Sequence, residues 1–116
     1  MLSTIPLRLR KPITLGQHQK LFTVCIAELI RWAYEQGYEI ACGDFFRGDG
    51  MGHKKNSNHY IKLAGDLNLF KAGVWQEKTE QHKELGEYWM TLHPLCKWGG
   101  LFGDGNHYSI TFQGRM

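Results

Sequence analysis

The sequence predicts a small α+β domain in which two main helices pack on an antiparallel sheet. Apolar residues recur at helical spacing in two segments, alternate with polar residues in three shorter segments, and are separated by glycine-rich stretches. The order helix, strand, strand, helix, strand favours antiparallel pairing. With 116 residues, 42% of them hydrophobic and 22% charged, the chain is expected to form a single domain spanning residues 1–116.

A long helix is predicted from about Thr14 to Gln36. Thr14 and Gln17 have the spacing of a capping box, in which each side chain satisfies a backbone amide at the helix start. Gly37 fits the left-handed residue that follows a helix end. One face of the helix is apolar, and it consists of Leu21, Val24, Cys25, Leu29 and Trp32. We therefore expect this helix to support the core rather than to carry function.

The other predicted elements are shorter. Strands are expected at Tyr38–Cys42, 63–70 and 107–112, and a second helix is expected at 79–93. Gly86 weakens that helix, and Pro94 ends it. Segments 43–58 and 96–105 are rich in glycine and lack periodicity, so both are predicted to be surface loops.

Composition excludes several classes of protein. Three cysteines without a C-x-x-C pair argue against a disulfide framework and against a thiolate zinc site. A net charge of +3 is too weak to indicate nucleic-acid binding. No apolar leader and no bilayer-length apolar segment are visible, so we expect synthesis in the cytoplasm without a signal peptide and no stable membrane insertion.

Two histidines and an aspartate form a candidate metal site. His59, Asp66 and His107 are residue types that zinc accepts, and three protein ligands leave a fourth position open for water. Asp104, three residues before the last histidine, could take a proton from that water. His59 and Asp66 are an odd number of positions apart, so in one regular strand they would point to opposite faces. The zinc hypothesis therefore requires a bend between His59 and the strand that carries Asp66.

The two segments that carry these residues, SNHYIKLAGDLNLF and WGGLFGDGNHYS, resemble the zinc D-alanyl-D-alanine carboxypeptidase and L-alanyl-D-glutamate endopeptidase family. This family includes VanY-type carboxypeptidases and small phage endolysins. The matching residues are Ser57, His59, Ala64 and Asp66, followed by Trp98, Gly99, Gly100, Phe102, Asp104 and His107. The chain departs from the pattern at Lys62, where the family usually has glycine.

The resemblance implies a hedgehog/D-Ala-D-Ala metallopeptidase-like fold and one Zn²⁺ per chain. It assigns the zinc to His59, Asp66 and His107, and the role of general base to Asp104. A non-zincin site agrees with the sequence, which contains no H-E-x-x-H motif.

Three further residues have alternative roles. Family members often carry an arginine near Arg47 that binds substrate or the developing oxyanion, although an ordinary surface arginine would look the same. Ser57 is either a hydrogen-bond partner of the metal site or a turn serine. Trp98 either lines the substrate cleft or belongs to the core.

The resemblance therefore implies a zinc peptidase that cleaves the stem peptide of peptidoglycan. The leading hypothesis is an L-alanyl-D-glutamate endopeptidase acting as a monomeric phage or prophage endolysin, which would need a holin to reach the cell wall for host cell lysis. A D-alanyl-D-alanine carboxypeptidase or dipeptidase is the nearest alternative. A non-catalytic zinc-binding module is an alternative from another class, and Asp104 argues against it. A phage tail or structural protein is a weaker option.

Overall fold

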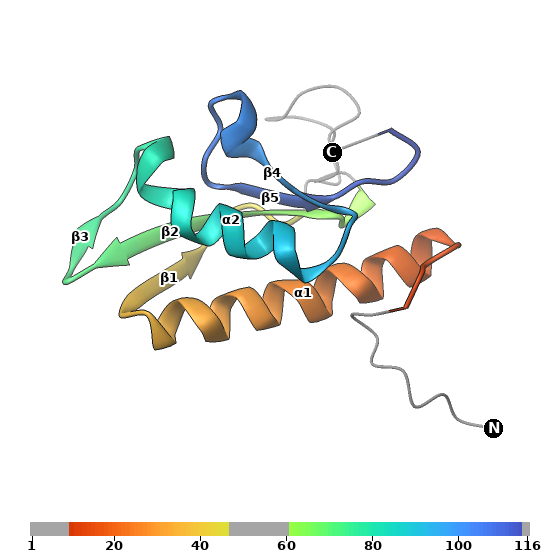
Figure 1. Cartoon of the computed structure of the whole chain (residues 1–116), viewed down its shortest axis with the longest axis horizontal. Helices are drawn as coiled ribbons and strands as arrows, with labels where there is room; N and C mark the ends of the chain where they lie inside the picture. The colour runs from red at the N-terminus through yellow and green to blue at the C-terminus, as the bar shows by residue number, and fades with distance from the viewer. Residues whose placement is uncertain (1–9, 47–60, 115–116) are drawn as a thin grey trace.

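The computed structural model describes residues 10–46 and 61–114 of the chain. The helices are α1 (Leu15–Glu35) and α2 (Lys83–Leu92), and the strands are β1 (Tyr38–Cys42), β2 (Ala64–Lys71), β3 (Val74–Trp75), β4 (Cys96–Trp98) and β5 (His107–Ile110). Two short 3₁₀ helices, η3 (Thr79–His82) and η4 (Gly99–Phe102), precede α2 and follow β4. The predicted α+β class, two helices on a small antiparallel sheet, is confirmed (Figure 1).

The sheet brings together segments that are distant in the sequence. Its strand order is β1-β2-β5-β4, with β3 added to β2 as a short hairpin, and every pairing is antiparallel. β2 therefore lies beside β5 at the centre of the sheet, and this pairing places Asp66 opposite His107.

The predicted start of the first helix is confirmed in detail. The backbone amide of Gln17 donates to Oγ1 of Thr14, and the backbone amide of Thr14 donates to Oε1 of Gln17, both at 3.1 Å. Gly37, just after the helix, has a φ of 91°, in the left-handed region that glycine adopts without a steric cost. Local sequence signals thus determine where α1 begins and where the chain turns into β1.

The core lies between the two helices and one face of the sheet. Leu67 and Leu69 of β2 are fully buried there together with Ile110 of β5, Leu29 of α1 and Trp89 of α2. Because side chains alternate along a strand, Asp66 and His107 project from the opposite face of the sheet. The helices therefore support the face that does not carry the candidate ligands.

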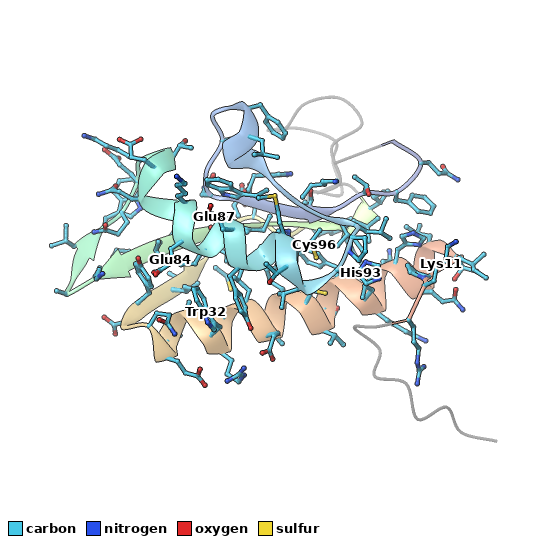
Figure 2. The ribbon with its side chains drawn as sticks, viewed as in Figure 1. Lys11, Trp32, Glu84, Glu87, His93 and Cys96 are labelled. Atoms are coloured by element: carbon cyan, nitrogen blue, oxygen red, sulfur yellow. The ribbon has the colours of Figure 1, made fainter. Side chains whose placement is uncertain are left out.

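A ring contact joins the two helices. Trp32 of α1 lies on the side facing α2 (Figure 2), and its indole stacks on the ring of Tyr88 with centroids 4.1 Å apart. The hydroxyl of Tyr88 also donates to Oε1 of Glu28, one turn before Trp32, at 3.2 Å. This contact fixes α2 against α1 beneath the sheet.

Some expectations about the elements were wrong. Residues 96–105 were predicted to be loop, but they contain β4 and η4, and β4 is an edge strand that pairs with β5. The predicted helix at 79–93 begins as the 3₁₀ helix η3 and becomes α-helical at Lys83. Both differences from the predicted elements result from tertiary packing, because Cys96 and Trp98 of β4 and His82 of η3 are buried.

Two further findings concern cysteines and membrane spans. Cys25, Cys42 and Cys96 are all free thiols, and the hydrogen bond of the Cys96 thiol to Cys25, together with burial, raises the pKa of Cys96. Across residues 10–46 and 61–114, neither helix combines the length and the apolar character needed to cross a bilayer.

Candidate metal centre

Asp66 and His107 form the described part of the candidate metal centre. They are directly opposite each other in the antiparallel β2–β5 pair. Oδ1 of Asp66 lies 3.6 Å from Nδ1 of His107, and the side chain of His107 is nearly buried while that of Asp66 is about one-fifth exposed at 21%. The sheet thus holds two candidate ligands side by side, with one of them open to solvent.

The separation of these two atoms fits a shared zinc ion. It exceeds the usual range for a nitrogen–oxygen hydrogen bond, which ends near 3.2 Å. Two ligand atoms that each lie about 2.1 Å from one tetrahedral ion are about 3.4 Å apart, close to the observed 3.6 Å. The donor set, one carboxylate oxygen and one imidazole nitrogen, is also one that zinc accepts.

Three of the predicted site residues lie outside the described residues, namely His59, Arg47 and Ser57. Among residues 10–46 and 61–114, no three side chains of His, Cys, Asp or Glu converge on a common metal position. The third ligand and the arginine therefore remain predictions.

Lys62, which stands where the family pattern has glycine, lies just before β2. Lys62 has a φ of 60°, so it occupies the left-handed conformation that glycine adopts most easily. Its ammonium group lies 5.1 Å from the centre of the Phe46 ring, at a distance suited to a cation–π interaction. In this chain, the position where the family pattern has glycine is thus left-handed, and it interrupts the extended chain before Asp66.

Asp104 lies on a tight turn that leads directly into β5. Its amide donates to the carbonyl of Gly99 at 2.9 Å, and its own carbonyl accepts from the amide of His107 at 3.1 Å. The carbonyl of Asn106 accepts from the amide of Leu67 at 2.9 Å, which joins the turn to β2. The backbone of the predicted base is therefore fixed relative to the Asp66–His107 pair, while Asp104 itself is exposed.

Trp98 belongs to the core. Only 6% of its surface is exposed, and its indole lies between Gly86 of α2 and Gly100 of η4. A Cβ atom at either glycine would fall 2.1 Å from the indole ring, so both positions exclude a larger side chain. The indole Nε1 donates to the carbonyl of Gly105 at 2.7 Å. Of its two predicted roles, Trp98 therefore has the core role. Its hydrogen bond to Gly105 also supports the turn that carries Asp104.

Close packing around Gly99, the first glycine of the W-G-G stretch, accounts for the absence of a side chain at this position. A Cβ atom there would lie 2.3 Å from the carbonyl oxygen of Asp104 and 2.7 Å from Cβ of His107. The chain at Gly99 thus packs directly against the two residues expected to perform chemistry. A larger side chain at this position would displace both.

The hydrogen bonds of Thr79 and His82 were not predicted from the sequence. Oγ1 of Thr79 accepts from the amide of Gly105 at 3.2 Å. His82 is 1% exposed, its Nε2–H donates to the carbonyl of Gln76 at 2.9 Å, and its Nδ1 accepts from the hydroxyl of Tyr108 at 3.0 Å. His82 is therefore a hydrogen-bonded core histidine.

The fold of this chain is similar to that of a solved peptidase structure. No protein-family model and no curated protein matches the chain. The crystal structure of the L-Ala D-Glu endopeptidase ChiX from Serratia marcescens matches with a TM-score of 0.59 and 17% sequence identity, over 91% of this chain and 92% of that chain. The chain has the fold of this endopeptidase. At this identity the match establishes the fold, and it spans nearly the full length of both chains.

Proposed function

We propose that the chain is a zinc-dependent peptidoglycan hydrolase, an L-alanyl-D-glutamate endopeptidase that cleaves the stem peptide. The observation that carries the proposal is the Asp66–His107 pair, whose 3.6 Å separation suits two ligands of one zinc ion. Asp104, the predicted general base, lies on the turn that leads into β5. The fold shared with the Serratia marcescens L-Ala D-Glu endopeptidase supports the choice of substrate.

In this proposal the residues of the chain divide the work of amide hydrolysis. Asp66, His107 and the predicted ligand His59 would hold one zinc ion, which would lower the pKa of a bound water and polarise the scissile carbonyl. Asp104 accepts the proton of the attacking water and returns it to the leaving amine. Arg47 would bind a substrate carboxylate or the developing oxyanion.

The biological setting follows from the same proposal. We place this peptidoglycan hydrolase in a phage or prophage, as an endolysin used for host cell lysis. Such an enzyme is made in the host cytoplasm, requires a holin to reach the wall, and acts as a monomer on an extended polymer. Its substrate partner is the peptidoglycan stem peptide.

One experiment separates this proposal from its alternatives. Purified peptidoglycan is digested with the chain in the presence of zinc, and the fragments are identified by mass spectrometry. Fragments with a new N-terminal D-glutamate support the endopeptidase. Release of D-alanine supports the D-alanyl-D-alanine carboxypeptidase instead, and zinc binding without any release supports a non-catalytic binding module.

A further inference from the structure

The peptide group between Asp104 and Gly105 is held at both of its polar atoms. Its oxygen accepts from the amide of His107 at 3.1 Å, and its N–H donates to Oγ1 of Thr79 at 3.2 Å. The orientation of this peptide plane sets the backbone torsion on the carboxyl side of Asp104. The two hydrogen bonds together therefore fix the backbone at Asp104, from which its side chain extends.

Thr79 packs closely against Gly105, the residue whose amide it accepts from. Gly105 is buried, and a Cβ atom there would lie 2.6 Å from Cα of Thr79. The two backbones are thus in direct contact. Without that hydroxyl, the Gly105 amide would be a buried donor without an acceptor, which is costly.

The short helix η3 that carries Thr79 is itself fixed to β5. At its other end, the imidazole of His82 accepts from the hydroxyl of Tyr108 at 3.0 Å and donates to the carbonyl of Gln76 at 2.9 Å. At its start, the amide of Lys78 donates to Oε1 of Gln81 at 2.9 Å. η3 therefore contacts the turn through Thr79 and the strand after His107 through His82.

We propose that Thr79 is a positioning residue for Asp104. Its hydroxyl holds the Asp104–Gly105 peptide in the orientation that directs the Asp104 carboxylate at the metal-bound water. Thr79 touches neither substrate nor zinc in this scheme, and it acts only through the backbone of the turn. This inference rests on the proposed function, in which Asp104 is the general base.

The test compares four variants with the wild-type chain. Thr79→Val removes the hydroxyl and keeps the shape, Thr79→Ala removes it without branching, and Thr79→Ser restores it. Thr23→Val on the exposed side of α1 is the matched control, because it deletes a threonine hydroxyl that bonds only the carbonyl of Gln19. For each protein, the exchange rate of the Gly105 amide is measured by NMR, together with zinc content and the kcat and KM for stem-peptide cleavage.

We expect Thr79→Val and Thr79→Ala to lose protection of the Gly105 amide and to lower kcat by about tenfold or more, with KM and zinc content nearly unchanged. Thr79→Ser and Thr23→Val should behave like the wild type. The use of two deletions ensures that a folding defect in one of them does not decide the result.

Two outcomes would overturn the inference, and they are distinguishable. If the wild type cleaves stem peptides and both deletions keep its kcat, Thr79 does not position the base, although the proposed function stands. If the wild type binds zinc but cleaves no stem peptide, the proposed function fails, and the role of Thr79 fails with it.

Discussion

Asp66 and His107 face each other across the β2–β5 pair, with 3.6 Å between Oδ1 and Nδ1. The pairing register fixes both backbones, so the separation does not depend on a loop. The helices cover the other face of the sheet, and the site face carries this carboxylate–imidazole pair.

Replacing Asp66 by alanine should remove zinc from the protein. Loss of one of three protein ligands should weaken zinc binding well beyond the roughly 10–100-fold typical for removing a mere supporting hydrogen bond. Ser109→Ala is the control, because Ser109 lies two residues after His107 and its buried hydroxyl has no hydrogen-bond partner among residues 10–46 and 61–114. Zinc titration and metal analysis check this. Equal zinc content in the Asp66→Ala and Ser109→Ala proteins would contradict the assignment.

Asp104→Asn should abolish turnover while zinc stays bound. The amide cannot accept the proton of the attacking water, and loss of a general base typically lowers the rate by about 10²–10⁴-fold. Asp104 is not one of the three predicted zinc ligands, so the metal content should be unaffected. Peptidoglycan cleavage and zinc content are measured on the same sample. Undiminished activity would remove the general-base assignment.

Lys62 should tolerate glycine and reject valine. Glycine relieves the left-handed strain at a φ of 60° but loses the contact with Phe46 and adds freedom to the unfolded chain. These effects nearly offset, so Lys62→Gly should change the free energy of unfolding by less than about 1 kcal/mol. Lys62→Val should lower it by about 1–2 kcal/mol, because β-branched residues strongly disfavour this conformation. Denaturant unfolding of both variants checks this, and equal stability would show that the left-handed turn is absent.

Gly86→Ala should destabilise the protein even though alanine is the better helix former. The propensity gain is about 1 kcal/mol, whereas a Cβ atom 2.1 Å from the Trp98 ring forces the packed indole to move. Overpacking of this kind costs about 1–3 kcal/mol, so a net loss is expected. Gly16→Ala in α1 is the matched control, since its Cβ would meet only Oγ1 of Thr14 at 4.0 Å and should stabilise the helix slightly. Thermal melts of both variants should shift in opposite directions.

The buried imidazole of His82 predicts a loss of stability in acid. Burial lowers the pKa of His82 below its usual value of 6.5, even though the hydrogen bond to Gln76 acts in the other direction. The unfolded chain therefore binds a proton first as the pH falls, so the stability from neutral His82 is complete above about pH 6.5 and declines below it. His82→Gln keeps a donor and an acceptor but does not titrate. Its unfolding free energy should fall less steeply than that of the wild type between about pH 7 and pH 5; parallel curves would contradict this.

The elements that could be predicted are those specified by nearby residues. The capping box of Thr14 and Gln17 and the left-handed Gly37 define the ends of α1, and all three are local signals. Lys62 shows the value of a family pattern, because the position expected to be glycine has the backbone conformation that glycine favours. β4 was missed because it has only three residues, borders two glycines, and is held in place by pairing with β5.

The supporting parts of the site depend on contacts between distant residues. Thr79 meets Gly105, and His82 meets Tyr108, in each case across 26 positions of sequence. No spacing rule connects such pairs, and threonine and histidine in a helical segment carry no distinguishing signal. The facing of Asp66 and His107 could be expected only from the family resemblance, since the strand register that creates it is a tertiary property.

The most direct test of the zinc centre is a crystal structure of the zinc-loaded chain with diffraction data collected on both sides of the zinc absorption edge. We predict a single anomalous peak within about 2.2 Å of a carboxylate oxygen of Asp66 and a ring nitrogen of His107, with His59 as the third protein ligand. A zinc peak located elsewhere, or a saturated protein with no peak between Asp66 and His107, would contradict the account.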